Sequence, residues 1–448
     1  MPLLRRKLFW VYDWLKGSKV LNHLDDIKTI LEEFNSTESL VRRDRHLKNV
    51  IRHAKQTVPF YRDNVKGDGL ERFPVINKDT IRENYEAFRS AKFKNDKQLK
   101  LVMTSGSTGA PFRVYHNINK RRRNSADMIY FMQKGGYILG EKVLFMKVWN
   151  DINKKSSWTR FKENIVPYNV FKYTDSDIAK LILDIENDSS EKNLVCFAST
   201  GKVIVDYMRN KRIKPKDYNI KSIITNSDAL DNSVKDQMEF YFKAPVVSRY
   251  SNIEGGMLAQ QMPSKGYEYD VNFASFFIEI LKMDEDEPAA SGEIGRVVIT
   301  DLFNYAMPLI RYYTGDLAQW SDKTNEYGAP RLESIVGRSD ELIRAGDNKV
   351  VTSYIIAANT WKYNEIRQFQ FIQTDVGTYT FRLNPWRLPF KEEKNLIKEF
   401  KGYLGENAKI NIEYVDEIPL LDSGKRKLVI NKLKTKCPSH TNSKTFSI

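Results

Sequence analysis

The sequence predicts an α/β fold, with a large first part and a small α+β block after it. From about residue 98, apolar strand-like runs alternate with helical patterns, as in Lys142–Val148, Ile178–Ile185 and Asn193–Ala198. This alternation is typical of parallel strands joined by helices. Short strands separated by turns begin at Gly292–Thr300, and an α-β-β-α-β pattern follows Gly337.

These changes of pattern divide the chain into segments. We expect a large domain over residues 1–338, opened by a helical lead-in over residues 1–60, and a small domain over residues 339–436. The polar residues 437–448 are expected to be a disordered tail. A length of 448 residues is too great for one ordinary domain, which agrees with this division.

Local signals predict several individual elements. Apolar residues recur three and four apart over residues 24–56, which predicts one helix that ends before Pro59. Asn77 is expected to cap a second helix whose first turn contains Lys78. The runs Gln368–Gln373 and Thr378–Leu383 are expected to pair as a hairpin.

Composition excludes several classes of protein. Apolar residues make up 41% of the chain, which is too many for a wholly disordered protein. The longest apolar stretches, such as Phe273–Leu281, are far shorter than the roughly 20 residues that span a bilayer. Cys196 and Cys437 form no CxxC pair, and Cys196 is expected in the core. A reducing, cytoplasmic location is therefore expected.

The net charge of +15 raises the question of an anionic partner. The run Arg121–Arg123 motivates a nucleic-acid-binding alternative, but no helix-turn-helix, RRM or zinc-finger signature accompanies it. We therefore expect no nucleic-acid partner.

The first 20 residues interleave apolar side chains with Arg5, Arg6 and Lys7. A short basic amphipathic helix of this kind can lie in an anionic membrane interface. Two interpretations stay open, peripheral contact at the inner face of the membrane and a helix packed on the protein's own surface.

The most informative stretch is the glycine-rich turn Met103–Pro111. Glycines let the backbone approach an anion closely, and successive N–H groups make an anion-binding concavity. Hydroxyl side chains add further donors, so a polyphosphate is the natural ligand. The turn lacks the Gly-Lys-Ser/Thr ending of a Walker A loop, which disfavours a P-loop NTPase.

Four further motifs follow in order, at Tyr250–Glu254, Arg311–Asp316, Gly337–Arg344 and Pro419–Lys425. Together with the glycine-rich turn they resemble the adenylate-forming superfamily, which includes acyl-CoA synthetases, peptide-synthetase adenylation domains and luciferases.

The N-terminal stretches His53–Arg62 and Phe73–Lys78 resemble phenylacetate–CoA ligase-like proteins, and within that group the chain looks most like the capsule-biosynthesis (CapK-type) branch. The resemblance covers roughly residues 40–436.

The resemblance implies an AMP-forming ligase that uses ATP and Mg²⁺ to convert a carboxylic acid to an acyl-adenylate with release of pyrophosphate. The acyl group would then pass to coenzyme A, a carrier thiol, or an amine or hydroxyl of a glycan. A role in surface polysaccharide biosynthesis is the implied setting.

The resemblance also implies roles for single residues. Lys425 would reach the α-phosphate and the carboxylate, and Glu254 would hold Mg²⁺. Asp340 would be the hinge about which the small domain moves. The β,γ-phosphates would be held by the turn residues Thr104, Ser105, Gly106, Ser107, Thr108 and Gly109.

The nucleoside would be bound by a second group of residues. Tyr250 would stack on the adenine, Asp316 would accept hydrogen bonds from the ribose hydroxyls, and Arg338 would donate to them. The remaining residues expected to line the nucleotide pocket are Asp228, Ser251 and Asn252.

Two positions depart from the pattern of the relatives. Relatives usually have Tyr-Gly-x-Thr/Ser-Glu at residues 250–254, whereas this chain has Ser251 in place of the glycine and Ile253 in place of the threonine or serine. Ile253 therefore removes a hydroxyl donor near the α-phosphate or the acyl carboxylate. A catalytically impaired homologue that acts as a binding protein is therefore an alternative. The glycine-rich turn and Lys425 are intact, which favours an active enzyme. Arg311 is expected to be a structural ion-pair partner rather than a ligand.

Overall fold

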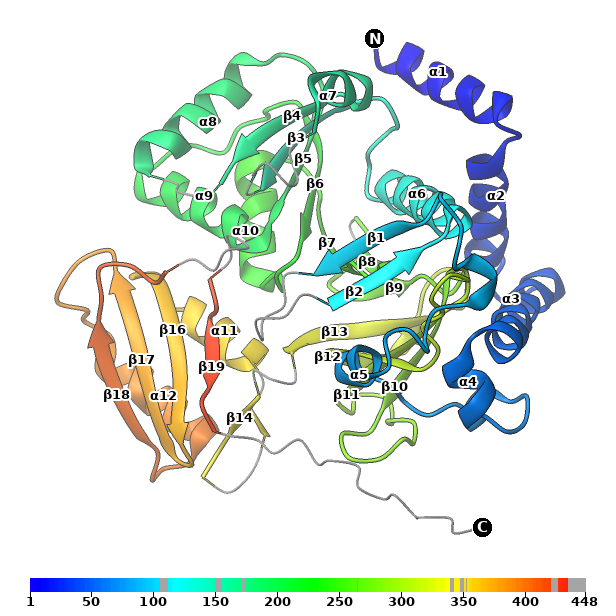
Figure 1. The fold of residues 1–448 in the computed structure, drawn as a ribbon. Helices are drawn as coiled ribbons and strands as arrows, with labels where there is room; N and C mark the ends of the chain where they lie inside the picture. The colour runs from blue at the N-terminus through cyan, green and yellow to red at the C-terminus, as the bar shows by residue number, and fades with distance from the viewer. Residues whose placement is uncertain are drawn as a thin grey trace. The chain divides into compact units, whose positions relative to one another are not determined.

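The structure is a computed structural model, and Figure 1 shows its fold. It describes residues 1–104, 112–147, 149, 155–170, 174–263, 265–338, 342–346, 350–351, 353–419 and 426–433. These residues fall into two compact units, one up to residue 338 and one from residue 342 onward. Among them, no helix is both long and apolar enough to cross a membrane.

Helices begin the first unit, and they differ from the prediction in one respect. The single helix predicted over residues 24–56 is wrong, because Ser36 accepts a hydrogen bond from the Ser39 N–H and caps a new helix. The helices are α1 (Pro2–Leu15), α2 (Lys19–Glu32), α3 (Thr37–Thr57), α4 (Pro59–Asn64) and α5 (Lys78–Glu83), with short 3₁₀ turns at Leu70–Arg72 and Ala91–Phe93.

An eleven-stranded sheet organises the first unit, in the order β10-β11-β12-β13-β9-β8-β7-β6-β5-β3-β4. Its last five strands are parallel, as the alternating sequence pattern predicted. These are β3 (Lys142–Lys147), β4 (Ile165–Asn169), β5 (Lys192–Phe197), β6 (Ile220–Asn226) and β7 (Val246–Asn252). The helices among them are α7 (Ser157–Glu163), α8 (Asp175–Asn187), α9 (Ala198–Asn210) and α10 (Asn232–Phe242).

The rest of this sheet is antiparallel. Its strands are β8 (Gly256–Gln261), β9 (Tyr269–Val271), β10 (Phe276–Leu281), β11 (Gly295–Asp301), β12 (Tyr312–Thr324) and β13 (Pro330–Arg338). A separate hairpin of β1 (Lys100–Thr104) and β2 (Phe112–His116) brings Thr104 opposite Phe112, and so fixes the two ends of the glycine-rich turn.

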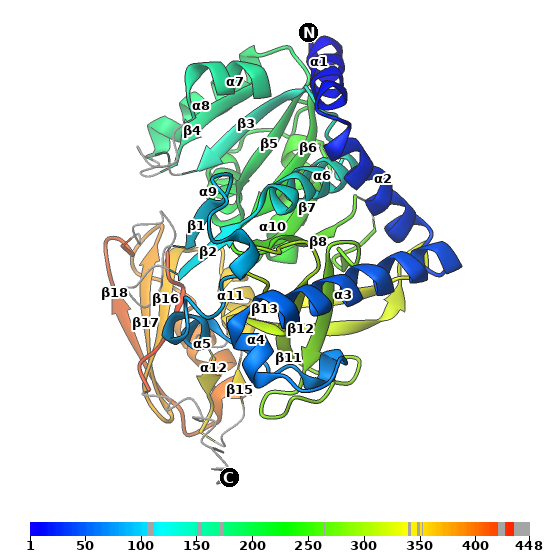
Figure 2. The same ribbon diagram turned by 45° about the vertical axis from the view of Figure 1, so that its right-hand side comes forward.

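The two faces of the parallel strands carry different cores. One face packs with α8, α9 and α10 around residues such as Leu194, Ile223 and Val246. The other face carries Val195, Ile224 and Val247, which pack with residues at and after the end of α6 (Ile118–Lys134). Figure 2 shows α6 beside α2.

The second unit is a small α+β body. Its four-stranded sheet has the order β18-β17-β16-β19, and the predicted hairpin is confirmed as the antiparallel pair β16 and β17. Phe371, Phe381 and Phe400 lie in its core. Its elements are β14 (Ile343–Arg344), β15 (Val350–Val351), α11 (Ser353–Trp361), β16 (Ile366–Asp375), β17 (Thr378–Pro385), α12 (Glu393–Leu404), β18 (Lys409–Tyr414) and β19 (Val429–Asn431).

Candidate active site

Tyr250, Asp316 and Arg338, which the family resemblance predicts to bind one nucleoside, lie together in the first unit. The Tyr250 hydroxyl at the end of β7 donates a hydrogen bond of 2.8 Å to Asp316 Oδ2. Asp316 in β12 lies opposite Arg338 in β13, and the Arg338 Nε atom is 3.8 Å from Asp316 Oδ1. The cluster therefore combines an aromatic ring, a carboxylate and a guanidinium.

Burial governs the protonation of this cluster. It raises the pKa of Asp316, although the positive charge of Arg338 and the Tyr250 hydroxyl oppose that shift. Burial, with the negative charge of Asp316, also raises the pKa of Tyr250 well above its usual value. Tyr250 therefore stays protonated and donates. Asp316 is 17% exposed and Arg338 is 48% exposed, so this end of the cluster is open to a ligand.

Glu254 forms a second centre, on the same strand–turn segment as Tyr250. Its side chain is 3% exposed, and its Oε1 atom accepts a hydrogen bond of 2.8 Å from the Tyr312 hydroxyl. The Lys78 Nζ atom is 3.3 Å from the same oxygen. His116 Nε2 donates to the backbone carbonyl of Glu254 at 2.8 Å. Two separate segments thus hold the Glu254 carboxylate, and a third holds its backbone.

Lys78 is a member of this centre that the sequence did not reveal. The predicted cap is confirmed, because Asn77 Oδ1 accepts the N–H groups of Asp79 and Thr80 at the start of α5. The segment before α5 runs beside β12. The Ile76 N–H donates a hydrogen bond to the Arg311 carbonyl, and the Ile76 carbonyl accepts one from the Tyr313 N–H. This backbone pairing places Lys78 beside Glu254. No local sequence pattern predicts that contact.

The other predicted nucleotide residues lie at the ends of β6 and β7. Asn252 Oδ1 accepts the Gly255 N–H at 2.6 Å, while its amide nitrogen is buried without a partner in the described part of the chain. Ser251 is exposed, and Ile253 is 54% exposed. Asp228 follows β6, and its carboxylate accepts a hydrogen bond of 2.7 Å from the Ser199 hydroxyl.

Several predicted residues cannot be placed. The backbone of Thr104 ends β1, but its side chain is not described. The tail 437–448 lies outside the described residues, as do the turn residues and the two residues of the C-terminal motifs, namely Ser105, Gly106, Ser107, Thr108, Gly109, Asp340 and Lys425.

A metal ion would have a limited set of protein ligands here. The described residues contain no group of three or more His, Cys, Asp or Glu side chains that could hold one. Mg²⁺ is commonly held by one or two carboxylates together with substrate phosphates, so the single buried Glu254 fits such a site. With Mg²⁺ bound, the Lys78 ammonium would either share the Glu254 carboxylate with the ion or move away from it.

Two residues have the structural roles that the sequence favoured. The Arg311 guanidinium makes two bonds to the Glu279 carboxylate, at 3.0 and 3.2 Å, and is buried. Cys196 is 2% exposed, and burial raises the pKa of its thiol to about 12.

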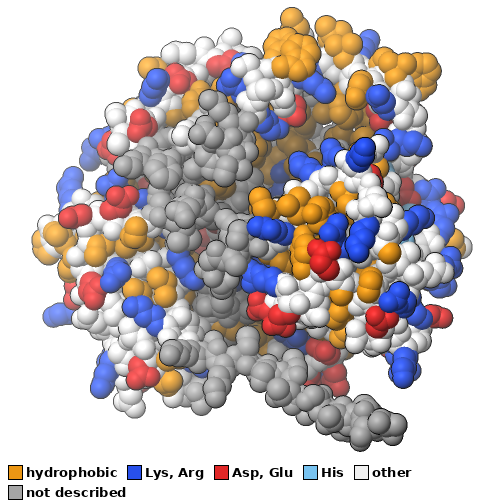
Figure 3. All heavy atoms as spheres, in the orientation of Figure 1, with side chains coloured by type: hydrophobic (Ala, Val, Ile, Leu, Met, Phe, Trp, Pro, Cys, Tyr) orange, Lys and Arg blue, Asp and Glu red, His pale blue; other side chains and the backbone are white. Residues whose placement is uncertain are grey.

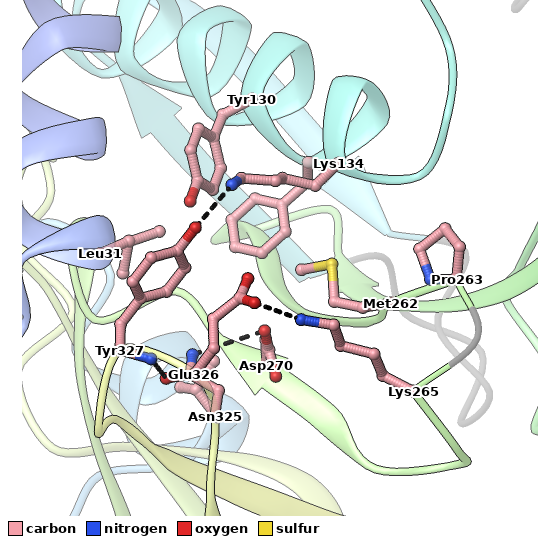
Figure 4. Close-up of a pocket in the computed structure, with 12 residues that line it drawn as sticks. Leu31, Tyr130, Lys134, Met262, Pro263, Lys265, Asp270, Asn325, Glu326 and Tyr327 are labelled. Atoms are coloured by element: carbon pink, nitrogen blue, oxygen red, sulfur yellow. Dashed lines mark hydrogen bonds and ion pairs between the residues drawn. The ribbon is translucent and has the colours of Figure 1, made fainter.

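A pocket in the first unit, drawn in Figure 4, lies apart from these residues and contains none of them. Its charged side chains already have partners. Lys134 contacts Glu32 at 2.8 Å and the Tyr327 hydroxyl at 3.2 Å, and Lys265 pairs with Glu326. Paired charges of this kind hold the pocket wall together, so we do not assign the pocket to the site.

The chain is similar to several known proteins. Residues 342–432 match the family model of the CapK C-terminal domain. Protein CapK of Staphylococcus aureus is 23% identical over 94% of this chain and 95% of its own length. The phenylacetate–coenzyme A ligase of Aromatoleum evansii is 23% identical over 90% of this chain and 96% of its own length.

A crystal structure of 2-hydroxyisobutyryl-CoA ligase in the postadenylation state shares the fold. It superposes with a TM-score of 0.68 at 17% identity and covers 90% of this chain and 92% of the other. The predicted fold class and the resemblance to CapK-type and phenylacetate–CoA ligase-like proteins are both confirmed.

Proposed function

Because homologues of the chain include CapK and phenylacetate–CoA ligases and its fold is that of adenylate-forming ligases, we propose that it is an AMP-forming ligase. It converts a carboxylic acid and ATP to an acyl-adenylate and pyrophosphate, and then transfers the acyl group to the thiol of coenzyme A. The observation that carries this proposal is the cluster of Tyr250, Asp316 and Arg338 beside the buried Glu254.

The cluster supplies the groups that a nucleoside needs. The Tyr250 ring offers a flat apolar surface to the adenine, and the Asp316 carboxylate accepts hydrogen bonds from ribose hydroxyls. Because Tyr250 and Arg338 hold Asp316 from two sides, its orientation is set before the nucleotide binds. Pre-orientation of this kind lowers the entropy lost on binding.

Glu254 serves the phosphate end of the same site. In the proposed reaction a carboxylate oxygen of the acid attacks the α-phosphorus, and pyrophosphate leaves. Mg²⁺ bound at Glu254 would neutralise charge on the phosphate oxygens. Tyr312 and Lys78 keep the Glu254 carboxylate in one position and compensate its burial. They are positioning residues in this scheme.

The resemblance supplies the remaining roles. Thr104 and the turn residues 105–109 would hold the β,γ-phosphates, Lys425 would bind the α-phosphate and the carboxylate, and Asp340 would be the hinge of a mobile domain over residues 339–436. Each is a proposal that a single substitution can test.

We propose coenzyme A as the acceptor because the relatives of the chain include phenylacetate–coenzyme A ligases. A glycan amine or hydroxyl in surface polysaccharide synthesis is the second candidate, by analogy with CapK-type proteins. Transfer of a labelled acyl group to coenzyme A, and not to a glycan precursor, would favour the first acceptor.

The experiment that tests the function is carboxylate-dependent exchange between ATP and pyrophosphate across a panel of acids. We expect exchange with at least one acid, and losses of about 100-fold or more in Glu254→Gln and Lys425→Ala. Glu326→Gln, which changes a carboxylate outside the site, is the matched control. No exchange with any acid, or full exchange in Glu254→Gln, would reject the proposal.

We also propose a peripheral contact between α1 and the inner face of the membrane. Only Asp13 of α1 is buried, while Leu4, Leu8, Val11 and Leu15 recur at spacings of four and three and are each more than half exposed. The apolar stripe of this helix therefore faces solvent, which a helix packed only on its own protein would avoid.

A second element extends this surface. Trp158 and Phe161 of α7 are 71% and 61% exposed, and the Arg5 Nε atom donates to the Phe161 carbonyl at 3.2 Å. Figure 3 shows hydrophobic side chains gathered over α1 and α7, with Lys and Arg side chains among them. Apolar and aromatic side chains beside basic ones suit an anionic lipid interface.

Vesicle sedimentation tests this contact. The full chain should bind vesicles that contain phosphatidylserine, and Leu4→Asp with Leu8→Asp should abolish binding. Val376→Asp, at an equally exposed apolar residue of the second unit, is the control. Deletion of α1 is less suitable, because Asp13 accepts the Val20 and Leu21 N–H groups at the start of α2. Equal binding by the double variant would reject the contact.

A further inference from the structure

Arg249 in β7 is a buried cation without a partner among the described residues. Its side chain belongs to a residue that is 8% exposed, and its Nε and Nη2 atoms are buried with no hydrogen-bond acceptor in the described part of the chain. Burial lowers its pKa to about 10, and no carboxylate of the described residues opposes the shift. The guanidinium thus remains charged at neutral pH.

Other buried cations of the first unit have partners: some pair with carboxylates, while Lys192 and Lys235 donate to carbonyl oxygens. Lys120 pairs with Asp301 at 2.7 Å, Arg123 with Asp26 at 2.6 Å, and Arg331 with both Glu268 and Asp270. An isolated buried charge costs several kcal/mol unless an anion compensates it. The exception at Arg249 therefore needs a specific cause.

The position of Arg249 indicates what that cause is. Ile224 and Val247 are partners in register between β6 and β7, and both pack on the α6 side of the sheet. Asn226 and Arg249 lie two residues further along the same strands, so alternation places them on that side too, at the carboxyl ends. In open α/β sheets, ligands bind outside the carboxyl ends of the strands.

The surroundings contain further unpaired polar atoms. Gln260 lies opposite Arg249 in the register of β7 and β8 and gives its amide to the Phe131 carbonyl of α6 at 2.7 Å, not to Arg249. Its own Oε1 atom is buried without a partner in the described chain, as is Asn124 Oδ1 in α6. Donors and acceptors left open on adjoining elements favour a polar ligand over an apolar one.

We propose that Arg249 binds a second anionic group, a carboxylate or a phosphate, on the acid that this site activates. The proposal rests on the proposed function. Arg249 directly precedes Tyr250, and alternation turns the two side chains to opposite faces of β7. An acid on the α6 face would therefore meet Arg249 with one end, while its other end reaches the nucleotide at the end of the strand.

The chemistry of the guanidinium matches this role. Its planar fork binds carboxylate and phosphate oxygens through two parallel hydrogen bonds. In a buried site, an acid that lacks the second anion leaves the charge uncompensated, so discrimination against it is strong. Arg249 is thus a specificity-determining residue of the proposed ligase.

Matched acids test the inference in the pyrophosphate exchange assay. The pairs are succinate with butyrate, glutarate with valerate, and 3-phosphoglycerate with glycerate. We expect kcat/KM at least 100-fold higher for one dianionic or phosphorylated member than for its partner. Arg249→Met should reduce that ratio to below threefold, and Arg249→Lys should retain part of it. Arg121→Met, at an exposed arginine, should leave the ratio unchanged.

Thermal unfolding supplies a readout that needs no catalysis. The preferred dianion should raise the Tm of the wild-type chain and leave that of Arg249→Met unchanged. Without ligand, Arg249→Met should melt at the same temperature as the wild type or higher, because it removes an uncompensated charge. An Arg249→Met chain that fails to fold would contradict the inference.

The two assays separate this inference from the proposed function. Exchange with monoanionic acids alone, unaltered in Arg249→Met, would overturn the inference and leave the function standing. No exchange with any acid, together with a dianion-dependent Tm rise that Arg249→Met loses, would reject the function and retain the anion site. Neither exchange nor a Tm rise would overturn both.

Discussion

Replacement of Lys78 by methionine should destabilise the first unit through Glu254. The change keeps most of the side-chain volume and removes the ammonium that lies 3.3 Å from Glu254 Oε1. Two unit charges at that distance interact by about 5 kcal/mol at an effective dielectric constant of 20. Lys78 is 26% exposed, so solvent screening reduces this value. The Tyr312 hydroxyl also remains on the carboxylate. We expect a loss of about 2 kcal/mol in the free energy of unfolding.

Urea unfolding of a double-mutant cycle measures this coupling. Lys78→Met in the Glu254→Gln background should cost little, because the buried charge is already gone. Lys48→Met is the control, since Lys48 pairs with Asp44 at 2.8 Å where both side chains are more than half exposed, and should cost less than about 0.5 kcal/mol. Equal costs for Lys78→Met in both backgrounds, or a cost no larger than the control, would refute the reasoning.

Three further outcomes follow from the same geometry. Burial and the positive charge of Arg123 lower the pKa of His23 from 6.5 to about 4, so the fold should lose about 3 kcal/mol as the pH falls through that window. His23→Gln should remove the slope in urea unfolding at pH 6.5 and 4.5. The raised pKa of Asp316 gives the opposite pH dependence, because the buried charged carboxylate lowers stability above that pKa. Asp316→Asn should therefore be more stable than the wild type at pH 7, with the difference vanishing below pH 3.8. Its exchange activity should fall at every pH. Asn77→Ala should cost about 1 kcal/mol, because it removes the cap of α5, and should lower exchange activity through Lys78.

The sequence predicted features that depend on short stretches of chain. The parallel strands follow from apolar runs such as Asn193–Ala198, and the start of α5 follows from the side chain of Asn77. The break between α2 and α3 was missed, because the apolar spacing continues across it while the cap depends on the single hydroxyl of Ser36.

The site divides in the same way. Motifs located Tyr250, Asp316 and Arg338, and strand pairing then brought them together. Lys78 and Arg249 were missed because their meaning depends on distant segments. Lys78 matters through its contact with Glu254, and Arg249 through the absence of a carboxylate among its described neighbours. Neither feature can be predicted from the residues that lie nearby in the sequence.

In the proposed reaction a carboxylate oxygen of the acid becomes bonded to the α-phosphorus of ATP. A single-turnover reaction with an acid carrying ¹⁸O in both carboxylate oxygens, followed by mass spectrometry of the nucleotide product, tests it directly. We expect AMP that contains one ¹⁸O atom after transfer of the acyl group to coenzyme A. Unlabelled AMP, or ADP with ¹⁸O in the released phosphate, would contradict it.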